Sequence, residues 1–275
     1  MLIEPFRRED IPGFLELAAA ERWLTDPWEF NVLLSAFSAG CFVARDVAST
    51  PPVGFITALK HECSGWIGNL IVSQDFRRQG IGETLFLQAL DALMSSGAET
   101  IWLTASTLGK SLYEKNGFSS IDMINRWSCT VGDRPVDQKK TANCSVTTPS
   151  VSSLDFQAWG DRRDALLAAV IERGKLLNTE CGFLVVQPSG ASLQFGPFSA
   201  QDTDAAEKLL VAALQSLPPG TTVCLDAPAS NNAATQLFRT YGMRISGRNE
   251  LMYAGVRPDF QAKFIYGLAT MGSCG

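Results

Sequence analysis

Apolar positions along the first 131 residues recur with the periods of strands and of helices in turn. Short apolar runs bounded by turn residues predict strands at 3–7, 40–45, 53–59, 66–72, 100–104 and 124–131. Between them, apolar residues at helical spacing predict helices. Their start signals are Asp10 with Pro12, and Asp26-Pro27 with Glu29 at the capping-box position; their stop signals are Gly97 and, after Leu112, Gly117. Strands that alternate with helices in this way predict an α/β fold with a mixed sheet.

The chain beyond residue 153 shows the same kinds of pattern. We expect a helix capped by Asp161, strands at 182–187 and 191–195, a helix from Asp204, a short helix after Asn231 and a closing strand at 251–253. The stretch 132–153 is polar and rich in Ser, Thr and Pro, which is typical of a linker. The sequence therefore predicts two domains, residues 1–131 and 154–275, joined by a linker over 132–153.

The strand at 66–72 runs into a turn of unusual composition, Arg77-Arg78-Gln79-Gly80-Ile81-Gly82, and a helix follows directly. Gly80 and Gly82 allow the backbone to approach a ligand closely. The free N–H groups at a helix N-terminus attract anions, and arginine side chains suit phosphate oxygens. The turn therefore predicts a pyrophosphate-binding cradle. The alternative is a glycine-containing turn with two solvated arginines.

Two other phosphate motifs do not fit this turn. The P-loop needs Gly-x-x-x-x-Gly-Lys-Ser/Thr, and the dinucleotide fingerprint needs a third glycine, whereas Glu83, Thr84 and Leu85 follow Gly82. The turn resembles instead motif A of the GNAT (Gcn5-related N-acetyltransferase) superfamily, Arg/Gln-x-x-Gly-x-Gly/Ala.

A second stretch, residues 106–118, resembles motif B of the same superfamily. Leu112, Tyr113, Gly117 and Phe118 match that motif, while Ser106 stands where Asn is usual and Gly109 where Ala is usual. Because the two motifs occur in register, the resemblance extends over roughly residues 1–131.

An internal repeat carries the resemblance into the second half. At an offset of 124 residues, the apolar face of the helix after Gly82 recurs in the helix from Asp204, and at an offset of 125 residues Asn231–Met243 repeats 106–118. The cradle does not recur. At the offset of 124 residues, the places of Arg77, Arg78, Gly80 and Gly82 are taken by Gln201, Asp202, Asp204 and Ala206. At the offset of 125 residues, Phe238 stands in the place of Tyr113. Carboxylates at this place repel phosphate and cap the helix.

The chain thus resembles tandem GNAT folds, each a mostly antiparallel twisted sheet flanked by helices. The second copy is degenerate, and we expect it to lack about one strand between Leu184 and Phe195. The resemblance is to bacterial GNAT proteins with a degenerate C-terminal acetyltransferase-like domain.

The resemblance implies that acetyl-CoA is the acyl donor. Its pantetheine arm would lie between two splayed strands and bond to the backbone of Leu70, Ile71 and Val72. The implied ligands of the pyrophosphate are Arg77, Arg78, Gln79, Gly80, Ile81 and Gly82, and Ser106 would bond near the pantetheine. Tyr113 is the implied general acid, since a phenol with a pKa near ~10 stays protonated at neutral pH.

The motifs leave open which residue deprotonates the amine. Glu62, just before the donor strand, and His61, the single histidine, are the candidates. Aromatic residues of the first two helices could line an acceptor pocket, although such residues belong more often to the core. These aromatic residues are Trp23, Trp28 and Phe30. In the second half, Asp226 and Asn231 would reach the acceptor if the two domains face each other.

Composition narrows the setting of the protein. Of 275 residues, 46% are hydrophobic and 19% charged, as in an ordinary soluble globular protein. A formal net charge of −5 argues against nucleic acid as a partner, and no apolar run reaches the length of a membrane span or of a signal-peptide core. Seven cysteines without Cys-x-x-Cys spacing are expected to be buried free thiols rather than disulfides or metal ligands. We therefore expect a cytoplasmic, metal-free protein; a homodimer stays open.

Two classes of function follow from the resemblance. The first is an N-acyltransferase that moves an acetyl group from acetyl-CoA to a primary amine by direct attack, with one active site in the first half. The second is a non-catalytic acyl-CoA-binding module with a regulatory or interaction role. Retention of Tyr113 and of both cradle glycines favours the enzyme. The motifs do not say whether the acceptor is a small amine, an amino acid or a protein.

Overall fold

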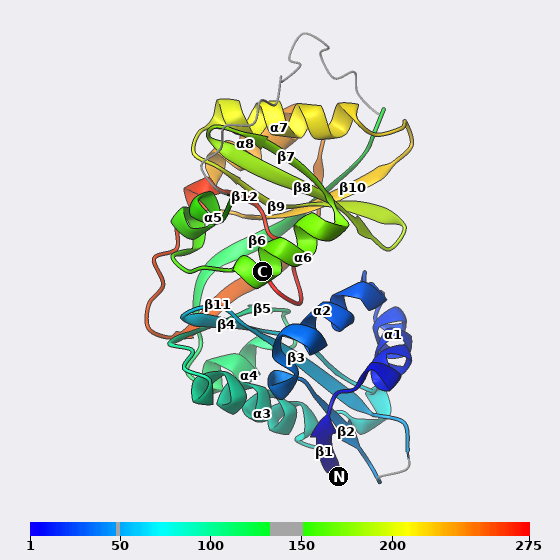
Figure 1. The fold of residues 1–275 in the computed structure, drawn as a ribbon. Coiled ribbons are helices and arrows are strands. Elements are labelled where there is room, and N and C mark those ends of the chain that lie inside the picture. Colours follow the sequence, from blue (N-terminus) through cyan, green and yellow to red (C-terminus); the bar gives the residue numbers. More distant parts are fainter. Residues whose placement is uncertain (48–49, 133–150) are drawn as a thin grey trace.

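The two halves of the chain share one sheet that is flanked by helices (Figure 1). The structure, a computed structural model, describes residues 1–47, 50–132 and 151–275. Most of the linker expected at 132–153 lies outside the described residues. Its last three positions belong to a helix that begins at Val151, so the second half starts earlier than the composition of this stretch indicated.

The first half follows the expected order of strands and helices, with small shifts at their ends. Its strands are β1 (Leu2–Pro5), β2 (Phe42–Arg45), β3 (Gly54–Lys60), β4 (Ser64–Val72), β5 (Thr100–Ala105) and β6 (Ser119–Thr130). Its helices are α1 (Ile11–Ala20), α2 (Pro27–Phe37), α3 (Ile81–Ser95) and α4 (Lys110–Lys115). Short 3₁₀ turns occur at Arg8–Asp10, Ser38–Gly40 and Gln74–Phe76.

The second half repeats this order from its first helices onward. Its helices are α5 (Val151–Trp159), α6 (Asp164–Arg173), α7 (Thr203–Gln215) and α8 (Asn232–Thr240). Its strands are β7 (Lys175–Thr179), β8 (Gly182–Ser189), β9 (Ser192–Ala200), β10 (Thr222–Pro228), β11 (Arg244–Gly255) and β12 (Ile265–Gly267), with a 3₁₀ turn at Ala262–Phe264. The sequence pattern did not predict α5, β7, β10 or β12.

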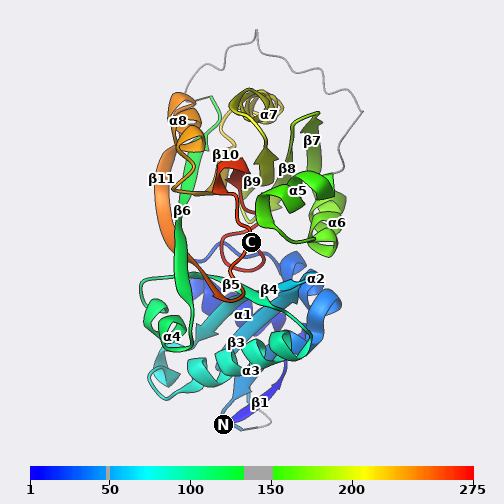
Figure 2. The same cartoon turned by 90° about the vertical axis from the view of Figure 1, so that its left-hand side faces the viewer.

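The order of strands shows that the two halves exchange their last long strands. The path is β1-β2-β3-β4-β5-β11-β6-β10-β9-β8-β7, so β11 lies beside β5 and β6 beside β10. Both are antiparallel pairs, and β11 and β6 also pair with each other along their length. In Figure 2 these two strands run side by side from one half into the other. We expected each half to be closed by its own strand; a two-residue period shows that a segment is a strand but not which partner it takes.

The path is symmetric about the β11–β6 pair, and this symmetry identifies the strand that the second half lacks. Strands β7, β8 and β9 occupy the places of β2, β3 and β4, while β1 has no counterpart. The expectation that a strand is missing between Leu184 and Phe195 is therefore wrong. Strands β8 and β9 fit into this short stretch because they are joined by a tight turn at Gly190, which has a φ of 59°.

In each half the central parallel strands separate after a short pairing. In the first half β4 and β5 pair only from Ser64 to Trp66 and then diverge. In the second half β9 and β10 pair at two positions, and β12 then pairs with β9. The N–H of Leu268, directly after β12, donates to the carbonyl of Asp226 on β10 (2.8 Å). The chain itself therefore fills the gap of the second half.

Apolar faces of the helices fix the position of the halves relative to each other. Helices α1 and α2 cover one face of the first sheet half and α3 the other, so that neighbouring residues Phe55 and Ile56 of β3 belong to different cores. The core under α1 and α2 continues into the second half through Leu154, Leu166 and Phe183. Each fully buried side chain of this size contributes roughly 1.5–3 kcal/mol. The halves therefore share a core as well as a sheet.

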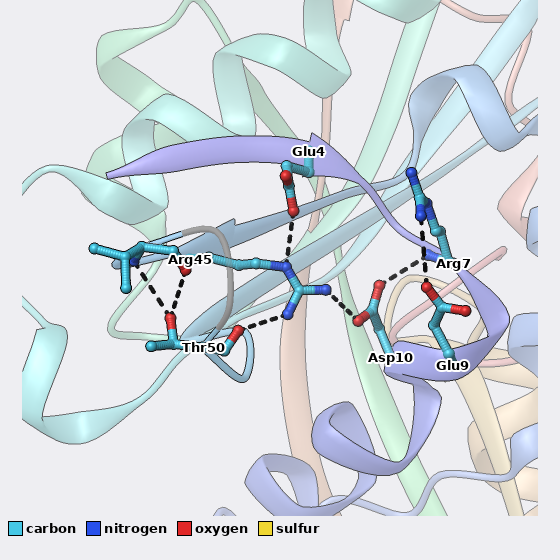
Figure 3. A network of polar contacts seen from close by, with 7 residues as sticks. Glu4, Arg7, Glu9, Asp10, Arg45 and Thr50 are labelled. Atoms are coloured by element: carbon cyan, nitrogen blue, oxygen red, sulfur yellow. Dashed lines mark hydrogen bonds and ion pairs between the residues drawn. The ribbon is translucent and has the colours of Figure 1, made fainter.

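Asp10 was expected to cap α1, but its carboxylate bonds elsewhere (Figure 3). One oxygen accepts the N–H of Arg7 (3.1 Å) and the other binds Nη2 of Arg45 (2.5 Å). The same guanidinium donates to Glu4 (2.8 Å) and to the carbonyl of Thr50 (2.7 Å). This network fastens the edge strand β1 and the start of α1 to β2.

Asp161 was expected to cap α6, but it joins the two halves instead. Its carboxylate accepts the N–H groups of Cys63 and Ser64 and the hydroxyl of Ser64 (2.6 Å) in the turn between β3 and β4. Nearby, the buried Arg163 forms a two-bond ion pair with the buried Asp155. The loop between α5 and α6 is therefore held against the β3–β4 turn by charged hydrogen bonds.

Candidate functional site

A β-bulge lies on β4 just beyond the point where β4 leaves β5. Asn69 and Leu70 together face the single residue Ile56 of β3, and Asn69 has a φ of 56°. The side-chain nitrogen of Asn69 donates to Thr57 (3.1 Å) and to Glu29 (3.0 Å). The expected donor strand, Leu70-Ile71-Val72, is thus the part of β4 that β5 leaves unpaired.

The expected cradle stands at the end of this strand. Gly80 adopts a φ of 81° and is the N-cap of α3, without a side-chain cap. Within the part of the chain that the structure describes, the N–H groups of residues 78–83 donate no hydrogen bond. These N–H groups and the positive end of the helix dipole leave a site for an anion.

The two arginines of the cradle have different surroundings. Arg77 donates from Nε to the carbonyl of Val72 (2.9 Å) and from Nη2 to Glu21 (2.5 Å), so it braces the turn between β4 and α3. This bond lowers the pKa of the Glu21 carboxyl. Arg78 is exposed, has a φ of 61°, and makes no side-chain contact with any residue that the structure places. Arg78 is therefore the arginine that is available to a phosphate.

Tyr113 on α4 reaches the same region from the other side of the gap. Its ring packs against Phe86 and Phe118, and only 8% of the residue is exposed. Burial raises the pKa of the phenol to about 12, so it stays protonated at neutral pH. A Cβ on Gly109 would lie 3.1 Å from this ring, which gives a reason for glycine where the motif usually has alanine.

A cavity of about 330 Å³ lies between the two halves, and of the expected site residues Leu70, Ser106 and Tyr113 line it while the cradle at 77–82 does not. From the first half it is lined by the unpaired part of β4, by Thr104, Ser106 and Tyr113, and by the segment from Arg22 to Glu29. From the second half come Arg173, Gln187, Gln194 and the segment from Ala269 to Ser273. The volume suits a small ligand with a few placed polar groups.

The segment from Ala269 to Ser273 closes the gap where β4 and β5 begin to diverge. The carbonyl of Gly272 accepts the N–H of Asn69 on β4 (3.2 Å), and the carbonyl of Met271 accepts the hydroxyl of Thr104 on β5. A Cβ on Gly68 would lie 2.4 Å from the carbonyl oxygen of Gly272, so only glycine fits there. The floor of the cavity therefore comes from the second half.

Glu29 presents a carboxylate to the cavity, and the sequence analysis assigned it only to a capping box. As expected, Asp26 caps α2 by accepting the N–H of Trp28 (2.9 Å), while the side chain of Glu29 accepts a hydrogen bond from Asn69. Burial raises the pKa of the Glu29 carboxyl, and hydrogen bonds from Asn69 and Ser273 offset part of that rise. A glutamate with a raised pKa at a cavity wall is a candidate general base.

A second charged group on the wall is held by a buried partner. Arg126 on β6 donates from Nε and Nη2 to the two oxygens of Asp226 on β10, both at 2.8 Å. Asp226 is fully buried, and the amide of Gln194 on β9 donates to it as well (3.1 Å). Asp226, which we expected at the acceptor, thus lies behind Arg126. The pair forms only because β6 crosses into the second half.

The remaining candidates lie outside the cavity. Glu62 is exposed in the β3–β4 turn, at the end of β4 opposite to the donor strand. His61 beside it is buried, with neither ring nitrogen hydrogen-bonded within the described ranges. Phe30 is a core residue, and Asn231 caps α8 through the N–H of Ala234 (2.9 Å). Of the aromatic candidates, Trp23 and Trp28 do line the cavity.

Cysteines and other potential ligands do not suggest a metal. Among the described residues, no group of three or more His, Cys, Asp or Glu is placed to hold an ion. Five cysteines are free thiols: Cys41, Cys224 and Cys274 are buried, Cys181 is partly buried and Cys63 is exposed, while Cys129 is partly buried. Cys144 lies outside the described residues. Among the helices placed by the structure, none combines the length and apolarity needed to cross a bilayer.

Comparisons with known proteins agree on one family. A family model described as "Acetyltransferase (GNAT) domain" matches residues 38–120, and a second model with the same description matches residues 151–267. A curated relative, the uncharacterized N-acetyltransferase YitH of Bacillus subtilis (strain 168), is 25% identical over 158 residues. This match covers 52% of the present chain and 54% of the relative, so the chain spans about half the length of the curated relative it matches.

Solved structures resemble the whole chain in fold. A putative acetyltransferase from Pyrococcus horikoshii has a TM-score of 0.85 at 24% identity and covers 100% of this chain and 95% of its own. A GCN5-related N-acetyltransferase from Sphaerobacter thermophilus has a TM-score of 0.65 at 16% identity and covers 96% of this chain and 98% of its own. The arrangement of two halves is therefore shared by proteins of low sequence identity.

Proposed function

The chain belongs to the GNAT acetyltransferases, and we propose that it transfers an acetyl group from acetyl-CoA to a primary amine at one active site in its N-terminal half. The observation that carries this proposal is the gap between β4 and β5, which opens onto a cavity lined by both Tyr113 and Glu29. A thioester in that gap would lie between a proton donor and a proton acceptor, as direct transfer to an amine requires.

The donor would bind along the strand-to-helix turn. The N–H groups of residues 78–83 and the exposed guanidinium of Arg78 would hold the pyrophosphate. The pantetheine arm would follow Leu70, Ile71 and Val72 along the edge of β4 that β5 leaves free, with Ser106 on the opposite side. The same edge offers N–H groups to the thioester oxygen as it gains negative charge.

The reaction would proceed in a single attack. The amine nitrogen bonds to the thioester carbon, its electron pair displacing the carbonyl electrons onto oxygen, and the carbon–sulfur bond then breaks. Tyr113 would protonate the departing thiolate of coenzyme A, and its raised pKa keeps the proton in place until sulfur leaves. The excess proton of the attacking nitrogen would pass to the general base, directly or through one water.

We assign the general base to Glu29 rather than to the sequence-based candidates. Glu29 lines the cavity and its carboxylate is aimed by Asn69, the bulge residue of the donor strand. Glu62 lies at the other end of β4, and His61 has its pKa lowered to about 3 by burial in a region that the cavity does not reach. A base must come within hydrogen-bond reach of the amine or of a bridging water, and of these three residues only Glu29 lines the cavity.

The second half would not bind acetyl-CoA in the same way. The gap between β9 and β10 is occupied by β12, so no strand edge is open to pantetheine there. Asp202 caps α7 by accepting the N–H of Ala205 (2.7 Å), which places a carboxylate at the position of the cradle. Phosphate would meet a like charge at this helix N-terminus. The second half would instead complete the acceptor side of the single site.

The test is the replacement Tyr113→Phe, with Tyr253→Phe on β11 as the matched control outside the cavity. Tyr113→Phe should lower kcat for acetyl transfer at least about 100-fold and leave the Kd of acetyl-CoA nearly unchanged, because the phenol acts on the departing thiolate. Tyr253→Phe should retain kcat. If acetyl-CoA binds but no amine of a broad panel releases coenzyme A, the protein is an acyl-CoA-binding module and not an enzyme.

A further inference from the structure

We propose that the acceptor is a small amine that also carries a carboxylate, as an amino acid does, and that Arg126 binds this carboxylate. The inference rests on the proposed function, since it names the acceptor class of the same site. It assigns a binding role to a residue of β6 that neither sequence motif includes.

Arg126 presents a free part of its guanidinium to the cavity. Nε and Nη2 are bonded to Asp226, and Nη1 has no partner among the residues that the structure places. The arginine side chain is 25% exposed while that of its partner is 0% exposed, so the positive end of the pair faces the cavity. A guanidinium that is held in place by Asp226 on one side is suited to bind a carboxylate on the side that faces the cavity.

The support behind Arg126 involves three strands. Asp226 on β10 receives hydrogen bonds from Arg126 on β6 and from Gln194 on β9, and its own backbone carbonyl accepts Leu268. Burying a charged pair yields little net stability, because apolar residues of similar volume usually serve as well. The pair is therefore better explained as a device that holds the guanidinium in one orientation at the cavity.

A negative charge on the cavity wall comes from Glu29 of the first half. Glu29 accepts hydrogen bonds but forms no ion pair within the described part of the chain. The other lining carboxylate, Asp26, is already paired with Arg173 (2.5 Å). An amine near Glu29 and a carboxylate near Arg126 would complement both walls, and a cavity of about 330 Å³ limits such a molecule to small size.

The other cations of the cavity are less suited to this role. Arg173 is engaged by Asp26 and lies over the ring of Trp28, with its guanidinium carbon 4.4 Å from the ring centre. Arg22 is exposed on the loop after α1, where water screens its charge. Arg126 is thus the cation that combines a fixed orientation with a free donor.

The experiment compares matched acceptors that differ only in the carboxylate. Each free amino acid of a panel is assayed beside its amide and its decarboxylated amine, with acetyl-CoA at saturation. We expect kcat/KM to be about 10- to 100-fold higher for the carboxylated member of a preferred set, the range of a charged hydrogen bond. In the double variant Arg126→Gln/Asp226→Asn, which leaves no buried charge unpaired, that preference should disappear through KM while the decarboxylated amine keeps its rate.

Two further variants keep the test decisive. Arg162→Gln, an exposed arginine outside the cavity, should leave the preference intact. If the double variant does not fold, Arg126→Lys is tested in its place. It keeps the positive charge but lacks the planar guanidinium, so it should raise KM only for acceptors that carry a carboxylate. Turnover of amines and amides as good as that of amino acids, or an unchanged preference in the folded variants, overturns the acceptor assignment and leaves the acetyltransferase proposal standing. Absence of turnover with every amine, while acetyl-CoA still binds, overturns both.

Discussion

At the scale of single residues, the cavity contains groups whose placement costs stability. The Glu29 carboxylate forms no ion pair with a described residue, and burial raises its pKa, although the nearby charge of Arg173 offsets part of that rise. Tyr113 keeps its hydroxyl at the cavity with no protein partner in the described ranges, and His61, outside the cavity, is buried with two unsatisfied nitrogens. Such groups are found where function, not stability, selects the residue, or where a tight interface leaves no room for water.

Glu29→Gln should separate activity from stability. A carboxyl whose pKa is raised on folding destabilises the folded state above that pKa, because the unfolded carboxyl ionises more readily. The variant should therefore be as stable as the native protein or more stable at pH 7, while kcat/KM falls about 100-fold. The native profile should lose activity as the pH falls through the raised pKa, and the variant should lack this acid limb.

The matched control for this prediction is Glu62→Gln in the exposed β3–β4 turn. Full activity and an unchanged pH profile are expected from it. A loss of the acid limb in Glu62→Gln, with a normal profile in Glu29→Gln, would make Glu62 the base. Thermal unfolding at pH 7 measures the stability of all three proteins.

His61 should make the protein sensitive to acid. Burial, together with repulsion from Arg163, lowers the pKa of His61 from 6.5 to about 3. Between these two pKa values, His61 is protonated in the unfolded chain but stays neutral in the folded protein. The free energy of unfolding therefore decreases as the pH falls from about 6.5 towards 3. In His61→Leu this contribution is absent, and the variant should gain stability relative to the native protein across that window, by an amount on the order of several kcal/mol at its lower end. Denaturant unfolding of both proteins from pH 7 to pH 4 measures the difference; parallel curves would show that His61 is not buried in the neutral form.

At the scale of elements, the proposed donor site depends on the unit formed by β4, its bulge and the start of α3. The two copies of this unit differ in the gap beside the strand and in the cap of the helix. In the first copy the segment from Ala269 to Ser273 bonds to Asn69 and Thr104 at the start of the gap, β5 leaves the edge of β4 beyond them unpaired, and Gly80 caps α3 without a side chain. In the second, β12 lies in the gap and Asp202 caps α7. The proposal that only the first half binds acetyl-CoA rests on these two local differences.

Gly80→Asp should give the N-terminus of α3 a carboxylate, as Asp202 does for α7. A Cβ on Gly80 would meet nothing within 4 Å, so the fold should accept a side chain apart from the strain of its φ of 81°. The introduced carboxylate would face the pyrophosphate site and weaken acetyl-CoA binding. Gly80→Asn has nearly the same shape and backbone strain without the charge. Calorimetric titration should therefore give a Kd for acetyl-CoA at least about tenfold higher for Asp than for Asn, and equal values would exclude an anion at this place.

At the scale of the whole molecule, the exchange of β6 and β11 makes one body of two homologous halves. In the first half β5 pairs with β11 of the second half, and in the second half β10 pairs with β6 of the first. A common core also lies under α1, α2, α5 and α6. The same exchange carries Arg126 to the cavity wall opposite Glu29. The acceptor side of the site is consequently a product of the interface and belongs to neither half alone.

Cleavage of the chain between the halves should leave them associated and active. A protease site placed within residues 133–150 would leave every described strand of the shared sheet uncut. We expect the two fragments to elute together and to retain acetyltransferase activity, because the β5–β11, β6–β11 and β6–β10 pairs and the shared core remain. Each half expressed alone should be insoluble or inactive, with a sheet edge exposed. Fragments that separate under native conditions would contradict the exchange.

Much of the fold and of the donor side of the site could be predicted from the sequence. Strand and helix periods, the glycines of the cradle and the spacing to Tyr113 are local features, set by backbone conformation and by side chains a few residues apart. The second copy could be found because its helix faces repeat at a fixed offset, and the loss of its cradle could be seen in Asp202 and Asp204. These predictions needed no knowledge of which strands pair.

Only the tertiary structure decided the rest. Glu29 carries a capping-box signal, and its role at the cavity depends on Asn69, 40 residues away, and on Ser273. Arg126 and Asp226, 100 residues apart, meet because β6 pairs with β10. The period of a strand is the same whichever neighbour it takes, so the sequence specifies strands without specifying their exchange. The proposed donor side could therefore be predicted from local pattern, whereas the proposed acceptor side could not, because its residues are brought together by long-range strand pairing.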